Sequence, residues 1–120
     1  MAIPSFNQFA AMLDDAVDRI PERFWGELAG GFNLRREAKH DGEYYIMGEY
    51  VEDGFGGCFI VFYYGSFVNL LNEEPLSVWE EEIIDTVLHE LQHHIEALAG
   101  RDDLARQEME ELARAMQKSE

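Results

Sequence analysis

Two histidines and a glutamate stand together in the segment His89-Glu90-Leu91-Gln92-His93, which has the pattern H-E-x-x-H. Residues four apart on an α-helix lie on the same face, about 6 Å from one another along the axis. Two imidazoles held in this way can bind one zinc ion, with metal–nitrogen distances of about 2.0–2.1 Å. Glu90, beside the first histidine, can then take the proton of a zinc-bound water. The motif therefore predicts a zinc hydrolase with His89 and His93 as metal ligands and Glu90 as the general base.

The residues around the motif predict one long helix over residues 76–99. Pro75 precedes this segment, and Gly100 follows it as the expected stop. Apolar residues recur along it at helical spacing and predict a core-facing stripe, which consists of Ile84, Val87, Leu88, Leu91, Ile95 and Leu98. His89 and His93 fall on the opposite face, so we expect the motif to open onto a groove. The alternative is a polar helix face on which both histidines are merely solvated.

A catalytic zinc usually takes three protein ligands and a water, so the motif needs a third ligand. Glu96 lies on the same helix face as the histidines, about 4.5 Å beyond His93 along the axis. Its side chain can lean back toward the metal, or it can accept a hydrogen bond that fixes an imidazole. Asp102 and Asp103 follow Gly100, where the chain can turn back toward the site. Asp103 is favoured narrowly over Glu96.

The other two histidines and the single cysteine are predicted to lie outside the metal site. His94 falls nearer the core flank of the predicted helix and is expected to be structural, and His40 is expected in a loop. Cys58 begins an apolar strand pattern, so a small core residue is a simpler interpretation than a nucleophile. One cysteine excludes an intrachain disulfide and fits a reducing compartment.

The charge of the chain limits the partners that we expect. Its 120 residues include 25 Asp and Glu against 9 Lys and Arg, a formal net charge of −16. Binding to nucleic acid or to an anionic membrane needs clustered Lys and Arg, so we expect neither. A cationic substrate is compatible with this charge, but solubility explains it more simply. The N-terminus lacks the features of a signal peptide and no apolar run reaches the roughly 20 residues of a membrane helix, so the expected location is the cytoplasm.

The order of predicted elements is helices, then strands, then helices, which is typical of a single α+β domain over residues 1–120. Helices are predicted at residues 5–20, 22–28, 67–71 and 76–99, and a final amphipathic helix at about residues 104–116. Strands at residues 32–37, 44–51 and 58–64 are predicted to form a small three- to four-stranded sheet, antiparallel or mixed. Residues 60–64 are the favoured edge strand, where an extended peptide can add through main-chain hydrogen bonds.

Residues 85–94, which read D-T-V-L-H-E-L-Q-H-H, together with Gly100 and Asp103 resemble the small bacterial zincin-like metallopeptidases called minizincins. The motif of that family, H-E-x-x-H-x-x-G-x-x-D, has two histidines and one aspartate on zinc and the glutamate as general base. The resemblance extends upstream to residues 48–50 and 60–65. It implies a zincin-like minimal domain with an N-terminal helix, the small sheet, the long HExxH helix and a C-terminal helix.

The resemblance also implies the ligand set and the activity. It gives the two motif histidines as zinc ligands, Glu90 as the base and Asp103 as the third ligand, and an upstream tyrosine, Tyr63 or Tyr64, can stabilise an oxyanion. The glycine of the family motif falls at Glu96 here, and Gly-x-x-Asp comes four residues later, which raises the standing of Glu96. The implied function is a zinc-dependent metallopeptidase that hydrolyses peptide or protein substrates through a Glu-activated, zinc-bound water. The alternative is a non-catalytic zincin-like module that binds metal or a partner protein.

Overall fold

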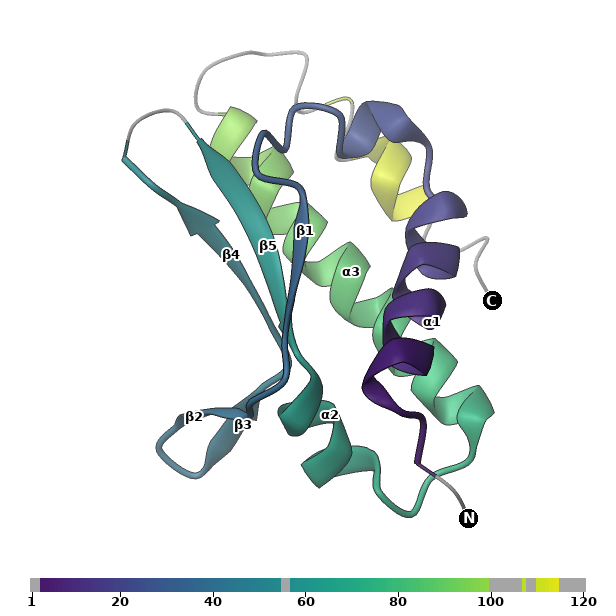
Figure 1. The fold of residues 1–120 in the computed structure, drawn as a ribbon. Coiled ribbons are helices and arrows are strands. Elements are labelled where there is room, and N and C mark those ends of the chain that lie inside the picture. Colours follow the sequence, from purple (N-terminus) through teal and green to yellow (C-terminus); the bar gives the residue numbers. More distant parts are fainter. Residues whose placement is uncertain (1–2, 55–56, 100–106, 108–109, 115–120) are drawn as a thin grey trace.

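Helices and five strands make up the part of the chain that the computed structural model describes, residues 3–54, 57–99, 107 and 110–114 (Figure 1). The helices are α1 (Phe6–Asp18), the short 3₁₀ helix η1 (Glu22–Phe24), α2 (Tyr64–Leu71) and α3 (Leu76–Ala99). The strands are β1 (Phe32–Arg35), β2 (Lys39–Asp41), β3 (Tyr44–Ile46), β4 (Gly48–Glu52) and β5 (Cys58–Tyr63). Both long helices, α1 and α3, lie on the same side of the sheet that β1, β4 and β5 form.

The central strand of this three-stranded sheet is β5, and the strand order is β1-β5-β4. The strand β5 pairs with β1 in parallel, with Ile60 opposite Phe32. It pairs with β4 in antiparallel orientation, with Phe62 opposite Gly48. The strands β2 and β3 pair with each other as a separate two-stranded hairpin. The strand that lies at the edge of the larger sheet and contacts α3 is therefore β4.

The predicted fold, a zincin-like minimal domain around one three- to four-stranded sheet, is wrong. The described chain is α+β, but its five strands form two sheets, one of three strands and one of two. The run 44–51 is not one strand, because it divides at Met47 into β3 and β4. The strand β3 turns back on β2 across Gly42, whose φ of 65° favours glycine. The predicted edge is also wrong, because residues 60–63 lie in the central strand.

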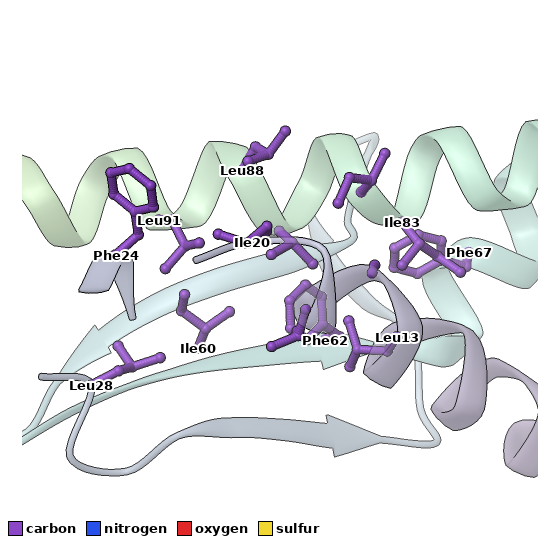
Figure 2. Packing of buried hydrophobic residues seen from close by; sticks show 14 of the residues in the cluster. Leu13, Ile20, Phe24, Leu28, Ile60, Phe62, Phe67, Ile83, Leu88 and Leu91 are labelled. Carbon is purple, nitrogen blue, oxygen red and sulfur yellow. The ribbon is translucent and has the colours of Figure 1, made fainter. Parts of the chain in front are cut away.

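An apolar cluster fills the space between α3, α1 and the three-stranded sheet (Figure 2). Its most deeply buried side chains, each no more than 3% exposed, come from all three layers and include Phe9, Leu13, Ile60, Phe62, Ile83, Val87, Leu88, Leu91 and Ile95. The chain enters α1 through a capping box in which the Ser5 hydroxyl accepts a hydrogen bond from the Gln8 N–H. Because α3 buries one face in this cluster, its other face is left to carry His89 and His93, which are both exposed.

The predicted C-terminal helix falls largely outside the described residues. Residues 110–114 are helical, and Leu112 is fully buried in the apolar cluster. Glu111 forms an ion pair with Arg23 of η1 at 2.6 Å, so this segment packs beside the short helix. Within the described part of the chain, no helix is long and apolar enough to span a membrane.

Candidate metal centre

The helix α3 exposes the two motif histidines at the spacing of a zinc-binding pair. The Nε2 atoms of His89 and His93 lie 3.3 Å apart, and their ring planes meet at 89°. Two zinc–nitrogen bonds of about 2.0–2.1 Å at a tetrahedral angle place their nitrogens about 3.3–3.4 Å apart. The distance between the two ring nitrogens is therefore the distance that one zinc ion requires between two ligands.

The carboxylate of Glu90 lies between α3 and the edge strand β4. Glu90 is only 6% exposed, and the backbone N–H of Tyr50 donates a hydrogen bond to its carboxylate. Burial raises the pKa of Glu90, while the neighbouring imidazoles of His89 and His93 and the Tyr50 N–H act in the opposite direction. A carboxyl group with a raised pKa beside two imidazoles is suited to accept a proton and to return it.

The contact between β4 and α3 depends on the absence of a side chain at Gly48. A Cβ at this position would lie 2.7 Å from Thr86 Cγ2 and 3.4 Å from Glu90 Cγ. Non-bonded carbon atoms normally pack at about 3.5–4.0 Å, so only glycine lets the strand lie this close to the motif. The sequence contained a signal for this contact, because an isolated glycine inside a strand pattern marks a close approach of the backbone.

Two hollows border the motif, and both have Gly48 and Glu90 in their walls. The larger, of about 630 Å³, is also lined by His93, Glu96 and several residues of β4. The smaller, of about 430 Å³, is also lined by His89 and by residues 45–47, where β3 leads into β4. Each histidine of the pair therefore lines an open hollow beside the edge strand.

The third metal ligand is not identified among the described residues. In that part of the chain, no three His, Cys, Asp or Glu side chains are placed together so that they could hold a metal. Glu96 is exposed and lines the larger hollow with His93, but it does not complete such a group. Asp103 lies outside the described residues. Both carboxylates therefore stay predictions for the third position.

The two tyrosines that were candidates for the oxyanion have other hydrogen-bond partners. The Tyr63 hydroxyl donates a hydrogen bond to Glu49 at 2.9 Å, and Glu49 also accepts one from Lys39 at 2.7 Å. The Tyr64 hydroxyl donates to the carbonyl oxygen of Pro4, beside α1. Neither of these two hydrogen bonds is made to a residue of the motif. The tyrosine beside the motif is Tyr50, which pattern analysis did not single out.

The other histidines differ in their surroundings. His94 is 1% exposed, and its Nδ1 lies 3.1 Å from the hydroxyl oxygen of Tyr50, in agreement with a structural role. His40 lies in β2 with its ring 4.3 Å from that of Tyr45, so its predicted place in a loop is wrong. Cys58 begins β5 as the strand pattern predicted, and it is half-buried against the core.

Comparison with known proteins gives a structural relative but no activity. No family model and no curated protein matches the chain. Among solved structures, the chain is similar to a conserved hypothetical protein (TTHA0227) from Thermo thermophilus, with 34% sequence identity and a TM-score of 0.71. The similarity covers 82% of this chain and 100% of that chain. Nothing in the relative's description indicates a zincin-like metallopeptidase.

Proposed function

We propose that this chain is a zinc-dependent metallopeptidase. The chain belongs to the same family as that conserved hypothetical protein. The observation that carries the proposal is the 3.3 Å separation of the His89 and His93 Nε2 atoms, next to the buried carboxyl group of Glu90. The likeness of the motif to that of the minizincins stays a prediction, since no family model matches the chain.

The motif histidines are the residues that would hold the metal. Two neutral imidazoles and one carboxylate, from Asp103 or Glu96, make a ligand set that zinc accepts in hydrolases. When bound, zinc supplies a Lewis acid that polarises a peptide carbonyl and lowers the pKa of a coordinated water. A site built only for structure usually has four ligands rich in cysteine, whereas the single cysteine of this chain lies on β5.

Glu90 is the proposed general base. Its carboxylate takes the proton of the attacking water and delivers it to the amine nitrogen of the leaving peptide. Burial between α3 and β4 favours the protonated form that this transfer produces, and the Tyr50 N–H holds the carboxylate in one orientation. Removal of this single proton acceptor is therefore expected to abolish turnover while the histidine pair keeps its spacing.

The edge strand β4 is the proposed binding site for the peptide. The hydrogen bonds from Tyr63 N–H to the Met47 carbonyl and from Asp53 N–H to the Gly57 carbonyl fix which residues of this strand face β5. In an antiparallel pair the hydrogen-bonded positions alternate, so the backbone of Gly48 faces away from β5, next to the motif. An extended peptide can add there as a further strand and place its carbonyl group beside the histidines.

We also propose that the protein acts in the cytoplasm. The single cysteine supports this location, because a chain that cannot form an intrachain disulfide is typical of a reducing compartment.

Zinc analysis and peptide hydrolysis test the proposed function together. Protein purified without chelator should hold one zinc ion per chain and should hydrolyse an unstructured peptide mixture, with both properties lost on chelation. His93→Ala should weaken zinc binding by more than about 100-fold, since even loss of an outer-shell partner typically costs about 10–100-fold. His40→Ala is the matched control, because it removes an exposed histidine from β2, and it should leave zinc binding unchanged.

Two outcomes would contradict the proposal. Protein that contains no zinc and gains none on titration would exclude the metal centre. Zinc binding without hydrolysis of any peptide would instead favour the non-catalytic metal-binding module.

A further inference from the structure

A third histidine of α3, His94, lies directly after the metal-site pair but is buried in the protein. His94 is 1% exposed, and its Nδ1 lies 3.1 Å from the Tyr50 hydroxyl oxygen, with the two ring centroids 5.4 Å apart. The Cys58 Sγ lies 3.8 Å from the same nitrogen, so β5 also contacts this imidazole. Tyr50 and Cys58 also line a separate hollow of about 340 Å³.

Tyr50 contacts α3 at two points, through its side chain and through its backbone. Its hydroxyl meets His94, and its N–H donates to the carboxylate of Glu90. Glu90 and His94 are four residues apart, so they lie on the same face of the helix, about 6 Å apart along its axis. One residue of the edge strand is thereby fixed against one full turn of the motif helix.

We propose that Tyr50 and His94 form a positioning pair that holds β4 against α3 and so orients the Glu90 carboxylate toward the histidines. Among the described residues, β4 pairs with another strand only on its β5 side. The contact of Tyr50 with α3 therefore controls where the other side of the β4 backbone lies. Small displacements of a catalytic group can lower a rate by as much as about 100-fold. The catalytic consequence rests on the proposed peptidase function, but the positional one does not.

Removal of single hydroxyl or imidazole groups tests the pair by its effect on turnover. Tyr50→Phe keeps the aromatic ring and loses only the hydroxyl, and His94→Leu loses the polar nitrogen. Both should lower kcat about tenfold, with KM and zinc affinity within about twofold of the wild type. His94→Asn returns a polar atom near the Nδ1 position and should restore most of kcat. Tyr64→Phe is the matched control, because it removes a partly buried tyrosine hydroxyl bonded to the Pro4 carbonyl oxygen, and its kcat should stay within about twofold.

Amide hydrogen exchange at residue 50, measured by NMR on metal-free protein, tests the same pair without turnover. We expect exchange at this amide to be at least about tenfold faster in Tyr50→Phe and His94→Leu than in the wild type, and unchanged in Tyr64→Phe. Unchanged exchange in the first two variants would overturn the proposal, as would a kcat for Tyr50→Phe equal to that of an active wild type. Faster exchange in both variants, together with a wild type that hydrolyses nothing, would refute the peptidase function and support the positioning pair.

Discussion

Substitution of Gly48 by alanine tests whether β4 lies as close to the motif helix as the structure shows. The new Cβ would lie 2.7 Å from Thr86 Cγ2, about 0.8 Å inside the shortest ordinary carbon–carbon contact. The threonine methyl cannot rotate away without loss, because Thr86 Oγ1 donates a hydrogen bond to the Glu82 carbonyl oxygen at 2.7 Å. The strand and the helix must therefore separate.

The expected cost follows from this overlap. Forcing an extra methyl into a packed contact destabilises a protein by about 1–3 kcal/mol. Gly48→Ala also gains a few tenths of a kcal/mol to about 1 kcal/mol from the lower chain entropy of alanine, so the centre of the two ranges gives an expected net loss of about 1–2 kcal/mol. For a domain of 120 residues this corresponds to a fall in Tm of roughly 3–12 °C. The same separation moves β4 away from Glu90 and should reduce turnover.

Thermal and urea denaturation of four proteins provide the assay: the wild type, Gly48→Ala, Thr86→Ser and the double variant. Thr86→Ser removes the methyl group that clashes and keeps the hydroxyl. In the Gly48→Ala background, Thr86→Ser should therefore raise the free energy of unfolding by at least about 1 kcal/mol. In the wild-type background it should give no such gain. Gly48→Ala with the stability of the wild type, and no coupling between the two sites, would refute the close approach of strand and helix.

Three other changes have expected outcomes. Burial raises the pKa of Glu90 above the ordinary value of about 4.3, so ionisation of this carboxyl group destabilises the metal-free fold. Glu90→Gln should therefore have a higher Tm than the wild type at about pH 8 and the same Tm at about pH 3. Equal Tm values at the higher pH would contradict this. The Lys39 ammonium lowers the pKa of Glu49, so Lys39→Met should have a lower Tm than the wild type at neutral pH. This difference in Tm should vanish as the pH falls through the lowered pKa of Glu49. A Tm difference that does not depend on pH would count against the ion pair. Leu91→Ala, at a fully buried site, should lower the free energy of unfolding by about 2–5 kcal/mol in urea titrations, and a loss below about 1 kcal/mol would show that this face of α3 is not core.

The helix that carries the motif was predictable because its signals are local. Pro75 stands before its first residue, and the apolar spacing persists from Ile84 to Ile95, so its observed bounds, Leu76–Ala99, are those predicted. The placement of His89 and His93 on one exposed face follows from the same period, because the core stripe fixes the rotation of the helix. The 3.3 Å approach of their ring nitrogens needed side-chain rotamers, which no pattern specifies.

The sheets were not predictable in the same way, because strand pairing is decided by contacts between distant residues. The parallel pair of β1 with β5 joins residues 28 positions apart, as in Phe32 with Ile60, and nothing local distinguishes it from an antiparallel pair. The three-residue strands β2 and β3 are too short to show an alternating pattern. The contact of Tyr50 with His94 likewise spans 44 residues, so the positioning pair is visible only in the folded chain.

The third metal ligand could not be predicted from the sequence for a different reason. Glu96 was attractive because it continues the histidine face, but a side chain on the same face must also bend back along the axis. Within the described residues it is not grouped with the histidines for metal binding, and Asp103 lies beyond them. A zinc titration of Glu96→Gln and Asp103→Asn therefore distinguishes the two carboxylates directly.

The most direct test of the account is the rate of peptide hydrolysis by Glu90→Gln, compared with the wild type at equal zinc occupancy. The substitution replaces the proton acceptor by a neutral group of the same shape and leaves the histidine pair in place. We predict full zinc binding with turnover reduced by at least about 100-fold, in line with the contribution of general-base catalysis. Undiminished turnover of zinc-loaded Glu90→Gln would contradict the role of Glu90 and with it the proposed mechanism.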